Sequence, residues 1–308
     1  MKILFVFSGN SDNGVSPIVS NQMFSIINEG ISISVFPIIG KGFWGYLKNI
    51  LPLKKRLKKE KVDITHAHYS LSSFIASLAG AKPLVVSLMG SDVKVNKWNR
   101  LILRLFNHFF WDYCIVKTEE MRTCLKSQNI AVIPNGVDLN KFKPFDKVAS
   151  QKKLNWNIEK KHILFAANPE ITLKNYKLAK QSFEQINQDD LEMHVLGDVP
   201  NDLMPFYYNA SDVVLLTSFT EGSPNVIKEA MACNCPIVST QVGDVYTNMK
   251  NLDGCYITTH DAKDVVNKLG IAIKFRQSTH GRDRIIQLGL DTKTIARKIT
   301  EIYEKVLS

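Results

Sequence analysis

The chain has 308 residues, of which 45% are hydrophobic, 22% charged and 9% aromatic. This length and hydrophobic content suffice for two compact domains, and the lack of low-complexity tracts or repeats excludes a disordered chain or a solenoid. The formal net charge of +10 indicates an anionic partner, without showing whether that partner is nucleic acid, a lipid or a phosphorylated sugar.

The apolar segments and the cysteines indicate the cellular compartment and whether the chain carries disulfides or a metal site. The first apolar run, residues 3–7, is too short for the core of a signal peptide, and no segment reaches the roughly 18 uninterrupted apolar residues that cross a bilayer. The five cysteines lack the paired spacing of a zinc site or a disulfide framework. We therefore expect a cytoplasmic protein with reduced thiols and no metal ion.

Short β-branched runs alternate with longer helical stretches through the first half of the chain. The runs are residues 2–7, 31–36, 62–65, 84–88 and 114–117. Such alternation is typical of a parallel sheet with crossover helices, so this half is predicted to form a Rossmann-like α/β domain.

Two stretches of this half bear on membrane contact. Between Lys54 and Lys61 the sequence reads Lys-Lys-Arg-Leu-Lys-Lys-Glu-Lys, directly after several apolar residues. Such a cluster suits adsorption to an anionic leaflet, and the alternative is a solvated helix face. The helix predicted over residues 98–113 also has an apolar face, which we assign to the core rather than to a membrane.

Turn residues mark a junction between two domains. Residues 133–138 read Ile-Pro-Asn-Gly-Val-Asp, and Phe142 and Pro144 follow them. We therefore predict a first domain over residues 1–144 and a second over residues 145–290. The second domain repeats the alternation, with strand-like runs at residues 163–167, 193–196, 213–217 and 236–240. An amphipathic helix over residues 291–307 either caps the second domain or crosses back to the first.

The run at residues 213–217 leads into the sequence Ser-Phe-Thr-Glu-Gly-Ser-Pro-Asn. Ser223 as the cap and Pro224 as the first helical residue predict a helix that starts there and continues to about residue 233. A ligand phosphate at this helix start would meet free backbone amides and the positive end of the helix dipole. Gly222 allows close approach to the backbone, and Glu221 and Glu229 can reach different parts of one elongated ligand. The segment therefore predicts a phosphate-containing ligand.

Residues 221–233, Glu-Gly-Ser-Pro-Asn-Val-Ile-Lys-Glu-Ala-Met-Ala-Cys, closely resemble the glutamate-x7-glutamate signature of retaining glycosyltransferases of family 4. Residues 134–138 are similar to the interdomain segment of that family, and Gly281-Arg282 with the final helix are similar to its C-terminal end. The resemblance extends over nearly the whole chain and is strongest at residues 191–245.

The resemblance implies a GT-B fold, in which two Rossmann-like domains face a cleft and the final helix returns to the N-terminal domain. The second domain would bind a nucleoside-diphosphate sugar and the first an acceptor, with no cofactor and no metal. Glu221 would hold hydroxyls of the donor sugar, and Glu229 would bind the ribose hydroxyls, since a carboxylate accepts two hydrogen bonds at once. The residues expected to meet the sugar and diphosphate are Gly222, Ser223, Pro224 and Asn225.

A lysine and an asparagine follow the first strand of the second domain. Lys174 resembles the family lysine that contacts the leaving diphosphate, where a positive charge stabilises the charge that develops as the glycosidic bond breaks. The family usually has an arginine shortly before this lysine, next to a glycine. Ala167 and Asn168 stand there instead, so neutralisation of the diphosphate depends on Lys174, on the helix start or on another basic residue.

The first domain carries the residues expected to line the cleft. Gly14 resembles the family's cleft glycine. His66 and His68 lie in a stretch similar to one at the cleft, and they are either acceptor contacts or satisfied histidines near a strand end. Met89 stands where many relatives carry a histidine, and it cannot transfer a proton. Gly90 and Asp92 follow it as further cleft residues.

Three functions remain open, and a nicotinamide-dependent dehydrogenase is excluded because residues 8–14 lack its glycine-rich turn. The first is a retaining glycosyltransferase in cell-surface polysaccharide or glycolipid synthesis, peripheral on the inner face of the membrane, with no nucleic acid partner. The second is a nucleotide-sugar epimerase of the same fold. Met89 and Asn168 motivate the third, a catalytically silent homologue that binds nucleotide sugar.

Overall fold

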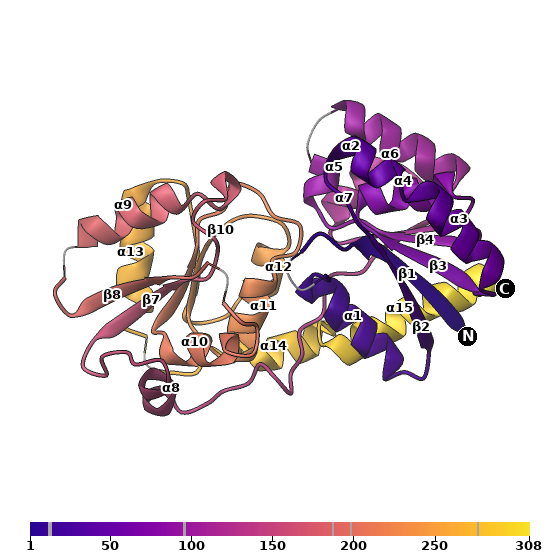
Figure 1. The fold of residues 1–308 in the computed structure, drawn as a ribbon. Helices are drawn as coiled ribbons and strands as arrows, with labels where there is room; N and C mark the ends of the chain where they lie inside the picture. Colours follow the sequence, from indigo (N-terminus) through magenta and orange to yellow (C-terminus); the bar gives the residue numbers. More distant parts are fainter. Residues whose placement is uncertain (12–13, 95–96, 187, 198, 276) are drawn as a thin grey trace. The chain divides into compact units, whose positions relative to one another are not determined.

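The computed structural model describes residues 1–11, 14–94, 97–186, 188–197, 199–275 and 277–308. The chain forms two compact units (Figure 1). Unit 1 contains Met1–Gly136 and Thr292–Ser308, and unit 2 contains Val137–Asp291. The first change of unit falls between Gly136 and Val137, eight residues before the position that the turn residues predict.

Unit 1 is built on a six-stranded parallel sheet with the strand order β2-β1-β3-β4-β5-β6. Its strands are β1 (Lys2–Ser8), β2 (Ser32–Ile38), β3 (Ile64–His68), β4 (Leu84–Ser87), β5 (Tyr113–Val116) and β6 (Ile130–Val132). Its helices are α1 (Pro17–Ile27), α2 (Gly42–Leu47), α3 (Ile50–Lys59), α4 (Ser70–Leu78), α5 (Ser91–Lys94), α6 (Lys97–Phe109), α7 (Glu119–Leu125) and α15 (Thr292–Leu307).

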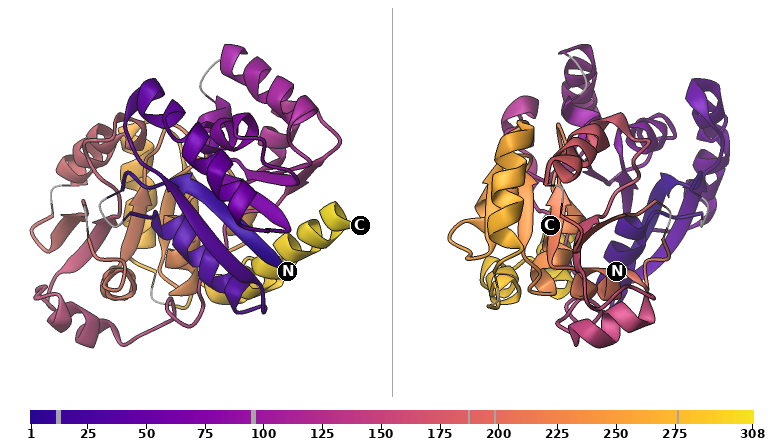
Figure 2. Two further views of the ribbon diagram at one scale, coloured as in Figure 1. Left: turned by 45° about the vertical axis from the view of Figure 1, so that its right-hand side comes forward. Right: turned by 90° about the vertical axis from the view of Figure 1, so that its left-hand side faces the viewer.

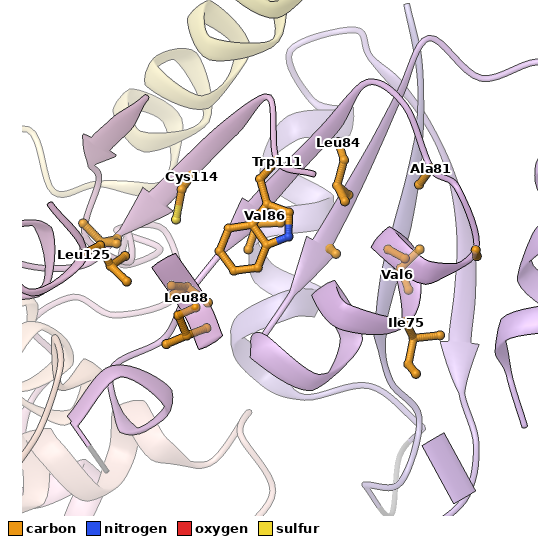
Figure 3. Packing of buried hydrophobic residues seen from close by; sticks show 14 of the residues in the cluster. Val6, Ile75, Ala81, Leu84, Val86, Leu88, Trp111, Cys114 and Leu125 are labelled. Atoms are coloured by element: carbon orange, nitrogen blue, oxygen red, sulfur yellow. The ribbon is translucent and has the colours of Figure 1, made fainter. Parts of the chain in front are cut away.

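Alternate residues of the strands point to opposite faces of this sheet, and each face is covered by its own helices. Leu4 and Val6 contribute to a core with α3, α4, α6 and α7, part of which Figure 3 shows around Trp111. The indole nitrogen of Trp111 donates to Ser77 at 3.0 Å, so the ring is buried with its polar atom satisfied. Ile3 and Phe5 pack on the other face, where α1 and α15 lie side by side (Figure 2).

Unit 2 has a five-stranded parallel sheet with the order β11-β10-β9-β7-β8. Its strands are β7 (Lys161–Phe165), β8 (Leu191–Val195), β9 (Val213–Leu216), β10 (Ile237–Thr240) and β11 (Cys255–Thr258). Its helices are α8 (Lys147–Lys153), the 3-10 turn η1 (Thr172–Lys174), α9 (Tyr176–Ile186), α10 (Met204–Ala210), α11 (Asn225–Ala232), α12 (Val245–Met249), α13 (Ala262–Ala272) and α14 (Gly281–Leu288). Residues of α10, α11, α12 and α14 cover one face, and residues of α9 and α13 cover the other.

The structure confirms the predicted fold class of two parallel-sheet α/β domains. The final helix, α15, belongs to unit 1, where Ile299 and Tyr303 are buried against the sheet. Its prediction as a helix that returns to the first domain is therefore confirmed, and the alternative of a cap on the second domain is wrong. Strands β6 and β11 are not predicted from the sequence.

Helix α6 corrects the prediction that its apolar face packs in the core. Leu103 is buried, but Leu101, Leu105 and Phe109 are exposed. The basic side chain of Arg104 instead turns inward, where Nη2 donates to the carbonyl oxygen of Cys124 at 2.6 Å. An amphipathic pattern distinguishes two faces of a helix, and here most of the apolar face lies on the solvent side. None of the helices in the described part of the chain is long and apolar enough to span a membrane.

Candidate functional site

Four loops of unit 2 follow neighbouring parallel strands, at the carboxyl ends where ligands bind in open α/β sheets. They come after β7, β9, β10 and β11, and the loop after β9, residues 217–224, contacts each of the other three. The carbonyl oxygen of Ser218 accepts hydrogen bonds from Thr240 Oγ1 at 2.8 Å and from His260 Nε2 at 3.1 Å. Loop 217–224 is therefore fixed to the ends of β10 and β11.

The same loop is also tied to the segment that carries Lys174. Buried Thr217 donates from Oγ1 to the carbonyl oxygens of Lys174 and Asn175, at 3.1 and 2.9 Å. The backbone amide of Phe219 donates to the carbonyl oxygen of Leu173 at 2.9 Å. These bonds hold η1 beside loop 217–224, although the two segments are more than 40 residues apart in the sequence.

Lys174 and Glu221, the two predicted catalytic residues, are in direct contact. Lys174 Nζ lies 2.6 Å from Glu221 Oε1, which also accepts a hydrogen bond from Ser218 Oγ at 2.8 Å. The two side chains are 25% and 15% exposed, so the pair is shielded but still reachable from solvent. The carboxylate therefore has one cationic and one neutral donor that hold its position.

Gly222 packs against the turn after β10. Gly243 has a φ of +54°, and a Cβ there would lie 2.0 Å from the carbonyl oxygen of Gly222. No side chain fits at that distance, so Gly243 is required both by its backbone conformation and by the close approach. This contact fixes Gly222 just before the start of α11.

Behind this contact, Ser223, Lys228 and Asp244 form a buried polar chain. Lys228 Nζ donates to Ser223 Oγ at 2.6 Å, and Ser223 Oγ donates to Asp244 Oδ2 at 2.6 Å. The Lys228 side chain is fully buried. Burial lowers the pKa of Lys228, while the charges of Asp244 and Glu229 act in the opposite direction. The chain fixes the Ser223 hydroxyl, so that group is a structural link rather than the predicted helix cap.

The start of α11 has no side-chain cap. Pro224 occupies the cap position with an extended backbone (φ −67°, ψ 121°), so the prediction of Ser223 as cap and Pro224 as first helical residue is wrong by one position. Among the residues that the structure describes, no side-chain cap bond satisfies the first amides of the helix. Asn225 Oδ1 and Asp244 Oδ1 are buried without a hydrogen-bond partner in the described part of the chain. Uncapped amides and unpaired polar atoms make this a place for a polar ligand.

Glu229 lies on the second turn of α11, where Tyr208 orients it. Tyr208 is fully buried and donates from its hydroxyl to Glu229 Oε2 at 2.7 Å. Burial raises the pKa of Glu229, and the hydrogen bond from Tyr208 and the nearby charge of Lys228 oppose that rise. The carboxylate is held by one oxygen, and Glu229 as a residue is only partly buried.

Asn168 accepts hydrogen bonds from backbone amides of its own loop. Its side-chain oxygen accepts from the amide of Glu170 at 2.9 Å, and its carbonyl oxygen accepts from the amide of Ile171 at 3.2 Å. These bonds form a turn before η1. The side-chain oxygen of Asn168 is therefore already engaged.

In unit 1, the two predicted histidines are fully buried. His66 Nδ1 lies 2.6 Å from the hydroxyl of Tyr303, and Nε2 lies 2.8 Å from Ser87 Oγ. His68 stacks on His66, with ring centroids 4.3 Å apart. Burial lowers the pKa of both residues, to about 3 for His68. His66 thus matches the alternative of a satisfied core histidine, and neither ring has solvent exposure for an acceptor contact.

The other predicted residues of unit 1 follow β1 and β4. Asp92 Oδ1 accepts from the backbone amides of Met89 and Gly90, at 3.1 and 2.9 Å, and burial raises the pKa of this carboxyl. Gly90 has a φ of +125°, which explains the glycine. Gly14 is exposed with a φ of +71°, and residues 12–13 of its predicted loop lie outside the described residues.

Sequence reasoning missed several residues of the unit 2 site, among them Lys228, Tyr208 and His260, for two different reasons. Lys228 precedes Glu229 in a helix, where lysine is normally solvated, and nothing in the pattern indicates its burial. Tyr208 and His260 come from other elements, and only the fold brings them to Glu229 and Ser218.

Potential metal ligands lie elsewhere in unit 2. Among the described residues, one group of three potential ligands lies close together, namely His162, Glu192 and His194. His162 and Glu192 lie near the starts of β7 and β8, at the edge of the sheet opposite to loop 217–224.

Two parallel-sheet α/β units, with a polar site at the carboxyl ends of the second sheet, define the GT-B class of glycosyltransferase folds. Sucrose-phosphate synthase from Thermosynechococcus elongatus superposes with a TM-score of 0.83 over 99% of both chains, at 14% sequence identity. Anabaena HepE, solved with UDP and glucose, superposes with a TM-score of 0.79 over 98% of both chains, at 18% identity. These likenesses concern the fold.

Family models identify the chain more closely. Residues 11–141 match the model described as Glycosyltransferase Family 4, and residues 150–274 match the one described as Glycosyl transferases group 1. The chain therefore belongs to the glycosyltransferases of family 4. A curated relative is the Escherichia coli UDP-Gal:alpha-D-GlcNAc-diphosphoundecaprenol alpha-1,3-galactosyltransferase, 27% identical over 273 residues, which cover 72% of this chain and 69% of that enzyme.

Proposed function

We propose that this chain transfers a sugar, with retention of anomeric configuration, from a nucleoside-diphosphate sugar to an acceptor in glycolipid or cell-surface polysaccharide synthesis. The observation that carries the proposal is the contact between Lys174 and Glu221 beside the uncapped start of α11. A cation, a carboxylate and a set of helix amides then lie within one group of loops. A diphosphate joined to a polyhydroxylated sugar requires these groups.

Donor binding would rearrange the contact between Lys174 and Glu221. In the free protein the carboxylate neutralises the ammonium group. A diphosphate carries more charge, so Lys174 would turn to the phosphate oxygens and release Glu221 to accept hydrogen bonds from sugar hydroxyls. Ser218 would keep the carboxylate in place. Lys174 and the start of α11 would then stabilise the charge that develops on the leaving diphosphate.

Glu229 would bind the nucleoside end of the donor. Tyr208 already holds Oε2, which leaves Oε1 and the second lone pair of Oε2 for the ribose hydroxyls. Because the tyrosine fixes the carboxylate before the ligand arrives, less side-chain entropy is lost on binding.

The acceptor proton would go to the leaving diphosphate. Met89 has no group that transfers a proton, and the Asp92 carboxylate already accepts hydrogen bonds from the amides of residues 89 and 90. A leaving phosphate oxygen on the same face of the sugar can accept that proton and direct the acceptor to that face. This pathway gives retention without a histidine at position 89.

Incubation of the purified chain with radiolabelled UDP-, GDP- and ADP-sugars tests the proposal, with membrane lipid extract and undecaprenyl-diphosphate sugars as acceptors. We expect label to move to an acceptor from one donor, and NMR of the product to show the donor's anomeric configuration. Epimerised sugar without acceptor would support an epimerase, and binding without turnover would support a silent homologue. Either result overturns the proposal.

The acceptor end of the proposal includes an anionic membrane surface on unit 1. Phe43 and Trp44 on α2 are 68% and 75% exposed, and Leu51 on α3 is 69% exposed. Helix α6 adds exposed Trp98 and Phe109. Helix α4 contacts α2, α3 and α6, so these side chains belong to one helical layer. Large apolar side chains gathered on one surface mark an interaction site.

Helix α3 and the residues after it also carry lysines. One hollow beside α3 is lined by Lys54, Lys58, Lys61 and Lys82, together with Glu60. Each lysine near an anionic leaflet contributes about 1 kcal/mol, and buried aromatic side chains add the apolar part of the binding. This pattern supports the membrane alternative for the basic cluster rather than a merely solvated face.

Vesicle flotation tests the membrane surface. We expect the chain to bind vesicles that contain phosphatidylglycerol and not vesicles of phosphatidylcholine alone, with release at high salt. The double variant Phe43→Ser and Trp44→Ser should bind about tenfold more weakly, whereas Ile286→Ser, an exposed apolar position of unit 2, should bind like the original chain. Equal binding of the double variant would contradict this surface.

A further inference from the structure

His162, Glu192 and His194 lie on two adjacent parallel strands at one edge of the unit 2 sheet. His162 pairs with Glu192, and Leu164 pairs with His194, in the register of β7 and β8. Glu192 and His194 are two residues apart in β8, so their side chains leave the same face of the sheet. His162 also points to that face, and the three side chains therefore converge from one surface.

The three potential ligand atoms are close enough for one ion. His162 Nδ1 lies 2.9 Å from His194 Nε2, and Glu192 Oε2 lies 3.8 and 3.9 Å from these two nitrogens. Ligands of a tetrahedral zinc ion, bound at about 2.1 Å, lie roughly 3.3 Å from one another. Shifts of about half an ångström would bring all three atoms to that spacing. Partly exposed His194 and Glu192 leave the site accessible from solvent.

Neighbouring groups orient His162 and Glu192 as metal sites require, whereas His194 Nε2 donates to His162 Nδ1 and would pass its proton to its own Nδ1 when a metal binds. His162 Nε2 lies 2.9 Å from the carbonyl oxygen of Asn157, which only accepts, so Nε2 carries the proton and Nδ1 offers a lone pair. Glu192 Oε1 is held by Lys160 Nζ at 2.9 Å, which leaves Oε2 directed to the histidines. The ring of Trp156 stacks on His194 with centroids 3.5 Å apart and fixes its plane.

We propose that His162, Glu192 and His194 bind a divalent transition metal of the zinc class, at a structural site remote from the transfer reaction. Two imidazoles and one carboxylate favour zinc over magnesium or calcium, which prefer oxygen ligands. The ion would join β8, the edge strand of the sheet, to β7. It would also fix Trp156 and the segment that precedes β7.

The site is separate from the proposed donor site. His162 is the second residue of β7, whereas Lys174 and Glu221 lie beyond the carboxyl ends of β7 and β9. Metal removal should therefore lower stability and leave transfer intact at moderate temperature. This inference does not depend on the proposed function.

Calorimetric titration of the tag-free, metal-stripped chain with zinc chloride tests the site. We expect one equivalent to bind, and an excess of magnesium not to compete. At about a hundredfold excess of zinc over the dissociation constant, the melting temperature should rise by about 5 °C. Cobalt should give visible absorption typical of tetrahedral coordination, and zinc should change the fluorescence of Trp156, which contacts His194.

Matched variants decide whether these residues hold the ion. His194→Ala and Glu192→Ala, at partly exposed positions, should fold and lose about 100-fold in zinc affinity, whereas His280→Ala, at an exposed histidine of the same unit, should bind normally. Absence of saturable zinc binding to the original chain would overturn the site. Undiminished binding by His194→Ala and Glu192→Ala would do so as well, and the three side chains would then be a hydrogen-bonded network.

Discussion

The predicted polar site residues of the two units differ in their solvent accessibility and in their free hydrogen-bonding capacity. In unit 2, Lys174, Glu221 and Glu229 remain partly accessible, and each is oriented by a neighbour that leaves part of its bonding capacity free. In unit 1, His66 is fully buried with both ring nitrogens hydrogen-bonded, and the Asp92 carboxylate accepts hydrogen bonds from local backbone amides.

Predicted polar site residues are therefore accessible in one unit and buried in the other. Unit 2 keeps charged side chains accessible to solvent. Unit 1 keeps its predicted polar groups inside and presents apolar side chains on α2, α3 and α6. The unit 2 residues should therefore affect turnover and donor affinity, and the unit 1 histidines should affect stability.

The largest effect is expected at Lys174. In the proposed mechanism Lys174→Ala removes the cation that would stabilise the leaving diphosphate, so kcat should fall by about 10² to 10³, with a smaller change in donor affinity. Lys177→Ala, at an exposed lysine of α9, is the matched control. Steady-state kinetics with saturating acceptor would measure both variants. An unchanged kcat for Lys174→Ala would remove this residue from the mechanism.

Two glycines with positive φ, one in each unit, differ in how closely other atoms approach them. Gly243→Ala should lower the free energy of unfolding by about 3 kcal/mol, because the new Cβ meets the Gly222 carbonyl as well as an unfavourable backbone region. Gly14→Ala adds a Cβ with no atom within 4 Å, so only the backbone cost of about 1 kcal/mol remains. Urea unfolding of both variants should show that order, and equal losses would contradict the close contact.

Glu229 should affect binding more than turnover. Glu229→Ala should weaken donor affinity by about 10- to 100-fold, since hydrogen bonds to a charged group contribute about 1.5–3 kcal/mol. Tyr208→Phe leaves the carboxylate but removes its orienting bond, so a loss of only a few fold is expected. Calorimetry with the nucleoside diphosphate measures both, and Glu184→Ala on α9 provides the control. Unchanged affinity in Glu229→Ala would count against the ribose contact.

The smallest effect concerns pH and His68. Its folded pKa lies below the unfolded value of about 6.5, so the unfolded state binds more protons in acid and stability falls as pH drops from about 6.5 toward 3. The slope is about 1.4 kcal/mol per pH unit. His68→Phe should remove this contribution, while His108→Phe at an exposed position should not. Urea unfolding at pH 7 and pH 5 measures it, and an unchanged slope in His68→Phe would contradict the assignment.

Sequence patterns predict most of the fold because buried parallel strands are continuous apolar runs. Strand β6 has only three residues, and in β11 only the last residue is buried, so neither is a continuous buried run of the kind that central strands form. The apolar stripe of α6 correctly predicts a helix, but the face that it predicts to be buried is mostly exposed. Periodicity does not say which face has a partner, and here Arg104 finds one on the neighbouring helix α7.

For the site, the sequence identifies Lys174, Glu221 and Glu229 as candidates but not their neighbours. The contact between Lys174 and Glu221 depends on Thr217, which joins two distant loops by side-chain bonds to the backbone. His162 and His194 are 32 residues apart, so only the pairing of β7 with β8 reveals their proximity. Contacts across strands are set by register, which local patterns do not encode.

The assignment of α15 to unit 1 has a consequence for synthesis on the ribosome. Unit 2 is one continuous stretch and can fold once Asp291 has left the exit tunnel. The face of unit 1 formed by Ile3 and Phe5 lacks Ile299 and Tyr303 until α15 is made. Unit 1 thus begins to emerge before unit 2 and is completed after it, and its uncovered apolar face is a natural substrate for chaperones during translation.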